Sequence, residues 1–302
     1  MTELIASAMR LMTSIAYVAL GESVAERSGM LNIGLEGVML LTAFTAAWIA
    51  ASAGSATAGV LLAILAGALI MSIIGLIELI FDADHIVVGI GVNLIGLGVT
   101  TVLFSDLTGT VRSVPSFGRI DIPLLSDIPV VGDAFFDHPI TTYLLLPITI
   151  AIAIIMTRTR WGLRLRAVGE TPEAVDAAGI AVIKVRLQAM AFCGAMVGLG
   201  GAALAIGQLS GFSENLTAGR GFLALAAVII GRWKPAGTVA ATFLLGIALA
   251  VTIQAPTWSW APEIPTSLLL MFPYVLGLLF LSIQRGATDP PRALGIPFLR
   301  TR

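Results

Sequence analysis

Long apolar runs dominate the chain and alternate with short polar segments. A helix needs about 20 apolar residues to cross the hydrocarbon core of a bilayer. The run 37–77 is long enough for two such helices, with a hinge at the small and polar residues 52–57. Further single spans are predicted at 3–21, 86–105, 139–157, 187–213, 235–262 and 264–284. The pattern therefore predicts an all-α, polytopic membrane protein with about eight to ten transmembrane helices.

One apolar run is too short to cross a bilayer. Residues 221–231 lie between Arg220 and Arg232 and number eleven, only about half of the required length. Helices that stop inside a membrane are tolerated where protein surrounds their free backbone groups. We therefore expect 217–231 to be part of a broken or re-entrant helix.

The composition supports the membrane class. The chain is 57% hydrophobic and 12% charged, whereas soluble domains are about a quarter charged. The net charge of −1 gives no argument for nucleic acid as a partner. Cys193 is the single cysteine of the sequence, so an intramolecular disulfide and a cysteine-based metal site are excluded.

Charge placement predicts the orientation. Segment 158–186 holds six of the 17 Lys and Arg residues, and positive segments stay on the cytoplasmic side. We expect this segment and the tail 285–302 to be cytoplasmic. The loop 105–138 contains five Asp against two Arg and is expected outside. One transmembrane domain, 1–302, results, with its N-terminus outside and its C-terminus inside.

The positive segment also contains a short helix signal. Thr171 is a candidate N-cap, Pro172 suits the first helical position, and Glu173 and Asp176 complement the helix dipole. Gly179 offers a left-handed stop. The segment is either a plain marker of the cytoplasmic side or a helix displayed to a partner. Charge and periodicity favour the two interpretations equally.

Polar residues inside the apolar pattern are the candidates for a transport path. Asn32 and Glu36 lie in the glycine-rich stretch 26–39, and transporters use broken helices of this kind to hold substrates. The alternative is a loop at the inner surface, in which Glu26 and its neighbour are solvated. Asn93 either joins two helices by hydrogen bonds or lines the path.

The sequence contains no recognisable catalytic motif. His85 and His138 are far apart, and there is no H-E-x-x-H, nucleophile elbow or Walker A sequence. We therefore expect a non-catalytic protein without a metal or cofactor of its own. Any uphill transport must draw on a partner chain or on an ion gradient. In an ion-coupled secondary transporter, which is the alternative, Glu36 and Glu78 would be the candidate intramembrane carboxylates.

Four sequence blocks together resemble one family. They begin at Glu26, Asp84, Val168 and Gly219 and read ERSGMLNIGLEGVML, DHIVVGIGVNLIGLGVT, VGETPEAVDAAGI and GRGFLALAAVIIGRWKPAG. The combination resembles permease subunits of bacterial ATP-binding-cassette (ABC) importers. Within that group it is similar to the branched-chain amino acid, simple-sugar and nucleoside permeases, and most to the nucleoside type.

The resemblance implies a role for the short helix, because such permeases dock on their ATPase through a cytoplasmic coupling helix. The residues that match this segment are Gly169, Glu170, Pro172, Glu173, Ala174 and Gly179. Asn32 and Glu36, then Asn93, are the residues expected along the path. The flanking arginines suit lipid headgroups and the ATPase equally.

The resemblance also implies the partners. They are an ABC ATPase that carries ATP and magnesium, a second and related permease chain, an extracytoplasmic binding protein and the lipid bilayer. Nucleic acid is not among them. The expected location is the bacterial inner membrane, and the expected cargo is a nucleoside or a related simple sugar.

Overall fold

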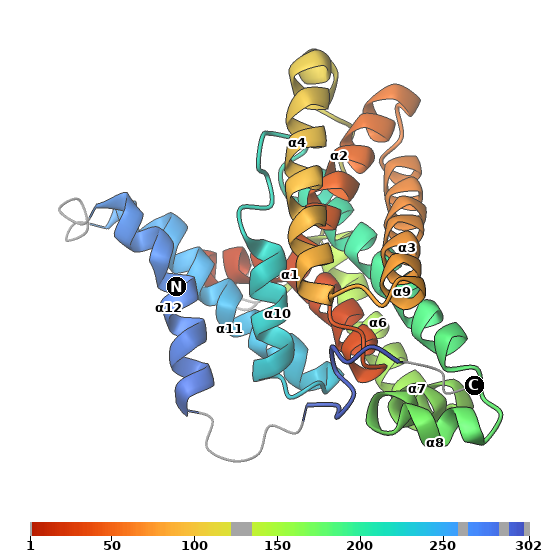
Figure 1. Ribbon diagram of the computed structural model, residues 1–302. Coiled ribbons are helices and arrows are strands. Elements are labelled where there is room, and N and C mark those ends of the chain that lie inside the picture. Colours follow the sequence, from red (N-terminus) through yellow and green to blue (C-terminus); the bar gives the residue numbers. More distant parts are fainter. Residues whose placement is uncertain (1, 122–134, 259–264, 284–289, 299–302) are drawn as a thin grey trace.

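The computed structural model describes residues 2–121, 135–258, 265–283 and 290–298 (Figure 1). Parts of the predicted outer loop 105–138 and of the tail 285–302 therefore lie outside the described residues. The chain forms helices joined by short connections, with one antiparallel pair of short strands. The elements are α1 (Thr2–Arg27), α2 (Leu35–Ala53), α3 (Ala56–Ile80), α4 (His85–Val111), β1 (Arg119–Asp121), β2 (Asp137–Pro139), α6 (Ile140–Arg158), α7 (Arg160–Glu170), α8 (Pro172–Ala177), α9 (Val182–Ala202) with the π-helical η1 (Ala203–Gln208), α10 (Arg220–Ile230), α11 (Pro235–Gln254), η2 (Ala255–Thr257) and α12 (Thr266–Ile283).

The predicted all-helical membrane fold is confirmed. Within the described residues, seven helices are long and apolar enough to cross a membrane: α1, α2, α3, α4, α6, α9 with η1, and α11 with η2. Two shorter apolar helices, α10 and α12, complete the set of apolar segments that the sequence predicted. The expected hinge in 37–77 is present, because α2 stops at Gly54 with φ 64° and Ser55 accepts a hydrogen bond from the N–H of Ala58.

The centre of the protein is built around α1 and α9, which contact each other and most other helices. Glycines allow the close approach of α9 to α3. A Cβ at Gly194 would collide with the backbone carbonyl of Gly67, and one at Gly198 with that of Ala63. Small residues of this kind are the usual way for membrane helices to reach contact distance.

The outer surface is formed by less buried helices. A span window of α4 is 17% buried and one of α3 is 28% buried, against 83% for α9 with η1. Leu65 and Leu69 on α3 and Leu94 on α4 are exposed. Surfaces of this kind suit lipid tails or a second membrane subunit, because neither requires polar side chains.

The two ends of the helix bundle differ. At one end the last residue of α1, Arg27, donates from Nε to the carbonyl of Trp233 at 3.3 Å, and α7, α8 and the tail lie beside it (Figure 1). We call this the α7–α8 end. The start of α1 lies toward the opposite end, where Arg10 lines a cavity with Arg119 and Asp137 of the strand pair. The described parts of the segments predicted to be cytoplasmic thus share one end, and the described parts of the predicted outer loop lie at the other.

Several predicted boundaries need correction. The first span continues beyond residue 21 to Arg27, because Glu22 and Glu26 are buried within α1. Helix α4 reaches Val111, so the predicted loop 105–138 starts inside a helix. Segment 158–186 is largely helical rather than a loop, since it contains α7, α8 and the first turn of α9.

The segment predicted as a broken helix is indeed interrupted. After Gln208 the chain continues without regular helix to Gly219, and then forms the eleven residues of α10. A turn with φ of 55° at Arg232 and 54° at Trp233 leads into α11. Since an α-helix rises about 1.5 Å per residue, the N-terminus of α10 lies about 16 Å from this turn. With this turn at the membrane boundary and α10 along the bilayer normal, the break would lie near the middle of a bilayer core of about 30 Å.

Candidate functional site

The α7–α8 segment presents one face to solvent at its end of the bundle. Helix α7 begins after Thr159, whose hydroxyl oxygen accepts a hydrogen bond from the N–H of Gly162 at 3.1 Å. Leu165 and Val168 are buried against the helix bundle, whereas Leu163 is exposed. The sequence did not predict α7, because its three arginines obscure the apolar face that it buries.

The residues predicted for coupling divide into two groups on this segment. Glu170, Glu173, Ala174 and Gly179 are exposed, so a partner can reach them. Gly169 and Pro172 are buried and support the segment from below. An apolar groove of about 480 Å³ crosses the exposed face, and it is lined by Arg160, Leu163, Arg164, Ala167, Ala174, Val175, Ala178 and Ile180.

The predicted cap at Thr171 is wrong. Pro172 does occupy the first position of α8, and Gly179 has the expected left-handed φ of 80°. The side chain of Thr171, however, makes no capping hydrogen bond, and its ψ is 73°. The reason is that Thr171 also ends α7, where its N–H donates to the carbonyl of Ala167. With φ −146° and ψ 73°, Thr171 lacks the extended conformation that an N-cap normally has.

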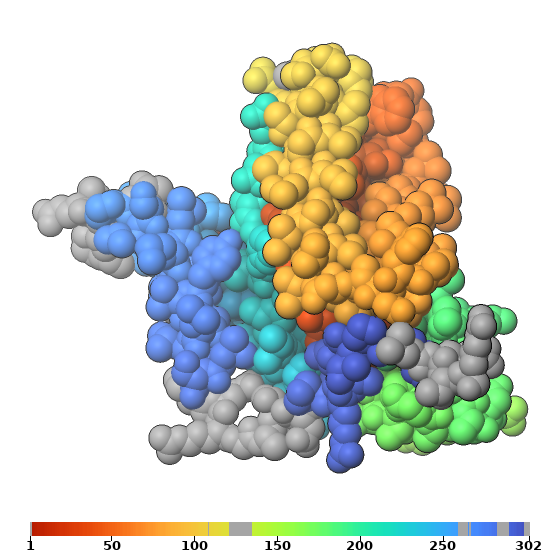
Figure 2. Space-filling model, in the orientation of Figure 1, coloured from red at the N-terminus to blue at the C-terminus, as the bar shows by residue number. Residues whose placement is uncertain are grey.

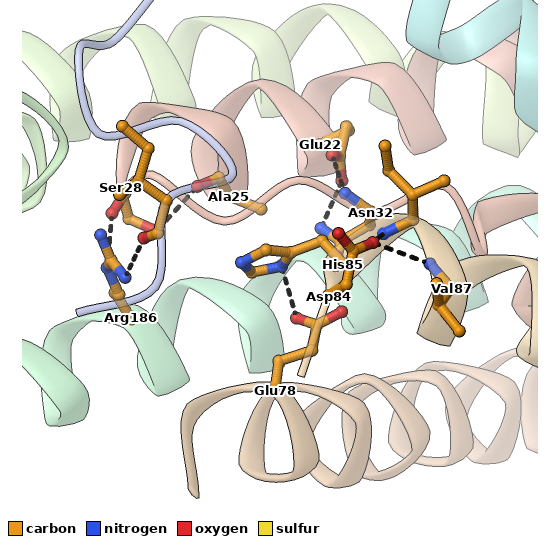
Figure 3. A network of polar contacts seen from close by, with 11 residues as sticks. Glu22, Ala25, Ser28, Asn32, Glu78, Asp84, His85, Val87 and Arg186 are labelled. Carbon is orange, nitrogen blue, oxygen red and sulfur yellow. Dashed lines mark hydrogen bonds and ion pairs between the residues drawn. The ribbon is translucent and has the colours of Figure 1, made fainter. Parts of the chain in front are cut away.

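The connection from α1 to α2 is held by buried polar groups (Figure 3). The carboxylate of Glu22 accepts hydrogen bonds from the N–H and from Nδ2 of Asn32, at 2.9 and 2.7 Å. Glu26, which is 1% exposed, accepts one from the indole N–H of Trp233. The alternative of a solvated loop is therefore wrong for Glu26. Asn32 is buried and supports the connection rather than lining an open surface.

Arg186, at the start of α9, is tied to the same connection. Its side chain is fully buried, and its Nε donates to the carbonyl of Ser28 at 3.2 Å (Figure 3). Its Nη1 donates to the carbonyl of Ile296 in the tail, also at 3.2 Å. One buried guanidinium thus joins three segments that are distant in sequence.

Glu36 closes the helix break. One carboxylate oxygen accepts from the N–H of Gly219 and the other from the N–H of Gly221, each at 2.7 Å. The first N–H groups of a helix have no partner within it, and the helix dipole favours a negative charge there. The carboxylate of α2 therefore satisfies the exposed start of α10 inside the membrane.

Further polar groups surround this break. Arg220 donates from Nη1 to the carbonyl of Leu216 at 2.9 Å, and the hydroxyl of Tyr274 on α12 donates to the carbonyl of Ala218 at 3.2 Å. Tyr274 remains 41% exposed. Charged and hydroxyl groups that stay partly exposed at this depth are costly against lipid and favour a water-filled path. We call Glu36, Arg220 and Tyr274 the mid-membrane cluster.

Asn93 fixes α4 to the start of α2. Its Oδ1 accepts from the N–H of Gly37 at 2.8 Å, and its Nδ2 donates to the carbonyl of Ile33 at 2.9 Å. Both ends of the amide are engaged in joining helices. This geometry favours the helix-joining interpretation, and Asn93 positions the stretch that carries Glu36.

His85 and Glu78 form a separate buried pair beside the turn from α3 to α4. His85 Nδ1 lies 3.0 Å from a carboxylate oxygen of Glu78, and both side chains are almost fully buried (Figure 3). The pair joins two neighbouring helices across their shared turn. It does not contact the mid-membrane cluster and carries no part of the site.

A second cavity lies toward the end opposite α7 and α8. The segment after η1 is anchored there by a hydrogen bond from the N–H of Phe212 to the carbonyl of Val111 at 2.8 Å. The ring of Phe104 lies 5.7 Å from that of Phe212. The cavity, of about 530 Å³, is lined by Phe104, Arg112, Leu209, Gly211, Phe212, Ser213, Glu214 and Leu216. The chain from 209 to 219 joins this outer cavity to the mid-membrane cluster.

Comparison with known proteins identifies the family. The model of the branched-chain amino acid transport system permease component matches residues 4–281, and the chain belongs to this family. It is 36% identical to the guanosine ABC transporter permease NupQ of Bacillus subtilis, over 95% of this chain and 93% of the relative. It is 34% identical to the nucleoside ABC transporter permease NupC of Lactococcus lactis, over 96% and 94%.

A solved ABC transporter of the metal-chelate type, in an inward-facing conformation, shares the fold. The TM-score is 0.50 at 16% sequence identity, over 93% of this chain and 85% of that chain. The chain is therefore a membrane-embedded, non-catalytic permease subunit of an ABC importer, and the ATPase is a separate chain. The family predicted from the four sequence blocks is confirmed.

Two of the residues that hold the site were missed by the sequence prediction. Glu22 lies at the end of an apolar run, where a buried carboxylate is costly unless it is paired. That cost was a usable signal. Arg186 gave none, because it stood among other basic residues of a segment that was assigned to solvent as a whole.

We predict that two substitutions of Glu36 distinguish the effect of the hydrogen bonds that it accepts from the effect of its negative charge. Glu36→Ala leaves the N–H groups of Gly219 and Gly221 without an acceptor and should lower stability by about 2 kcal/mol. Glu36→Gln keeps one acceptor oxygen and should lose clearly less. Thermal unfolding of the purified permease in detergent measures both variants. An Ala variant as stable as the wild type would contradict the capping role.

Proposed function

We propose that this chain forms one half of the pathway through which an ATP-driven importer moves nucleosides into the cell. The observation that carries the proposal is the polar helix break. Glu36, Arg220 and Tyr274 gather at the start of α10, at a depth where lipid accepts no such groups. The nucleoside and guanosine permeases that resemble the chain along its whole length support the choice of cargo.

The outer cavity offers the right chemistry for such a cargo. Phe104 and Phe212 provide an aromatic wall on which a base stacks, and such stacking tolerates different bases. Arg112 and Glu214 supply hydrogen-bonding groups for ribose hydroxyls. A nucleoside released by the binding protein enters here and moves along residues 209–219 to the mid-membrane cluster.

The coupling segment, residues 169–179, is the docking site of the ATPase. Its exposed groups are Glu170, Glu173, Ala174 and Gly179, and the neighbouring apolar groove has the size for an anchoring side chain. The α7–α8 end accordingly faces the cytoplasm, in line with the six basic residues of segment 158–186. Residues 290–298, which contact this end through Gly169, are cytoplasmic as well.

A second permease chain completes the pathway. The outer cavity and the mid-membrane cluster are open on this subunit, and a path through a bilayer needs protein on every side. The partner is a related but different permease. ATP-driven closure of the two ATPases then switches the pair between outward and inward access, which requires different contacts in the two states.

Charge reversal tests the docking of the motor. Glu173→Arg should weaken ATPase binding by roughly tenfold or more, because it places a cation in a contact made for a carboxylate. Co-purification of the ATPase with the tagged permease measures binding, and uptake by reconstituted vesicles measures transport. Glu3→Arg, at the opposite end, is the matched control. Normal docking and uptake by Glu173→Arg would refute the coupling assignment.

Substrate preference tests the cargo. We expect vesicles that contain the whole transporter and its binding protein to take up labelled adenosine or guanosine and to exclude labelled ribose. Phe104→Ala should raise the KM for the nucleoside about tenfold through lost stacking. Val102→Ala, on an exposed face of the same helix, should leave KM unchanged. Equal uptake of ribose would overturn the nucleoside assignment.

A further inference from the structure

The C-terminal residues 290–298, which we call the strap, lie across the α7–α8 end of the permease. Figure 2 shows this dark blue segment between the green α7–α8 region and the bundle above it. The strap contains two turns, closed by hydrogen bonds from the N–H of Leu294 to Pro291 and from the N–H of Ile296 to Ala293. It bridges the coupling segment and the connection from α1 to α2.

On one side, the strap binds the end of α7. The N–H of Ala293 donates to the carbonyl of Gly169 at 2.8 Å. Carbonyl groups in the last turn of a helix find no N–H donor within that helix. The hydrogen bond from Ala293 therefore satisfies a carbonyl that α7 leaves free. Gly169 is held tightly, because a Cβ there would collide with the carbonyl of Arg27 and crowd Pro291.

On the other side, the strap binds the α1–α2 connection. The N–H of Gly295 donates to the carbonyl of Gly29 at 3.0 Å. The buried guanidinium of Arg186 donates to Ile296 in the strap and to Ser28 in the connection. Gly29 has a φ of 91°, which only glycine adopts without strain. The strap therefore contacts a backbone conformation that requires glycine at position 29.

Two apolar side chains anchor the strap in different parts of the core. Leu294 packs against the main hydrophobic cluster, to which Met30 of the connection belongs. Phe298 packs against the cluster that contains Val168 and Val175 of the coupling region. The strap therefore spans the boundary between the part that meets the motor and the part that surrounds the path.

We propose that the strap is a positioning element of transport, which transmits displacement of the coupling segment to the α1–α2 connection and so to Glu36. The inference rests on the proposed docking of the ATPase at 169–179. From Gly29 the chain runs through Asn32, held by Glu22, to Glu36 at the start of α10. A shift of Gly169 reaches Gly29 through three successive residues of the strap, Ala293, Leu294 and Gly295.

The test uses two strap variants in the complete transporter, with permeases, ATPases and binding protein in vesicles. Truncation after residue 289 removes the strap, and Leu294→Ala with Phe298→Ala removes its two apolar anchors. We expect both to retain the ATPase in co-purification and to lower uptake of labelled guanosine per ATP hydrolysed. The expected loss is roughly threefold to thirtyfold, the range found for changes along coupled networks.

Two matched controls separate coupling from folding. Ile296→Ala changes an exposed side chain but keeps the carbonyl that accepts from Arg186, and it should transport normally. Truncation after residue 298 keeps the whole strap and should also transport normally. If the truncation at 289 is not inserted in the membrane, the double alanine variant decides the question alone.

The possible outcomes distinguish the inference from the docking proposal. Loss of uptake in the strap variants with the ATPase still bound supports the strap, whereas Glu173→Arg should lose the ATPase itself. Normal uptake per ATP in the double alanine variant would overturn the strap proposal and leave docking intact. Normal docking in Glu173→Arg would overturn the assignment of 169–179. Loss of the bound ATPase in the strap variants would show that the strap serves docking and would also overturn its role in transmission.

Discussion

A helix that starts inside a bilayer exposes N–H groups that lipid cannot satisfy, and the arrangement of this permease depends on how Glu36 meets that requirement. Its two carboxylate oxygens hold Gly219 and Gly221. Because Glu36 sits in the first turn of α2, the position of the break follows the position of the α1–α2 connection. Any movement of that connection must either carry α10 with it or break the two hydrogen bonds that hold its start.

Buried charged and polar side chains in turn hold the connection from α1 to α2 in place. Glu22 holds Asn32, Glu26 holds Trp233, and Arg186 holds Ser28. Hydrogen bonds between buried polar groups favour one arrangement, because an arrangement that breaks them leaves further buried donors and acceptors without partners. Such a network ties α9 and the turn before α11 to α1 and the connection. It suits a transporter in which a force applied at α7 and α8 must reach a site deep in the membrane.

The sequence predicted those features that depend on bilayer thickness and local chemistry. Apolar run lengths located the spans, and the short run before Arg232 correctly indicated a break. Glu36 was expected to be functional or paired, because an unpaired carboxylate there is costly. Its partner Gly219 is 183 residues away, so no local pattern could reveal it. The same holds for Arg186 and Ser28, which are separated by 158 residues.

Local rules failed at Thr171 and along α7. The pattern at Thr171 is a good N-cap signal, yet that residue closes α7 as well as opening α8. Helix α7 itself was hidden, because its basic residues resemble a solvated positive loop. Its buried side, Leu165 and Val168, becomes visible only against the surface on which it packs.

In the proposed mechanism, force at the coupling segment moves the helix break beside Glu36. Cys193 is fully buried, so spin labels can be placed selectively at exposed positions such as Phe222 on α10 and Leu65 on α3. Pulsed electron paramagnetic resonance on the assembled transporter would measure the distance between the two spin labels with and without ATP. The account predicts a shifted distance distribution on ATP binding that Glu173→Arg abolishes. A distribution that stays unchanged while the complex transports its substrate would contradict it.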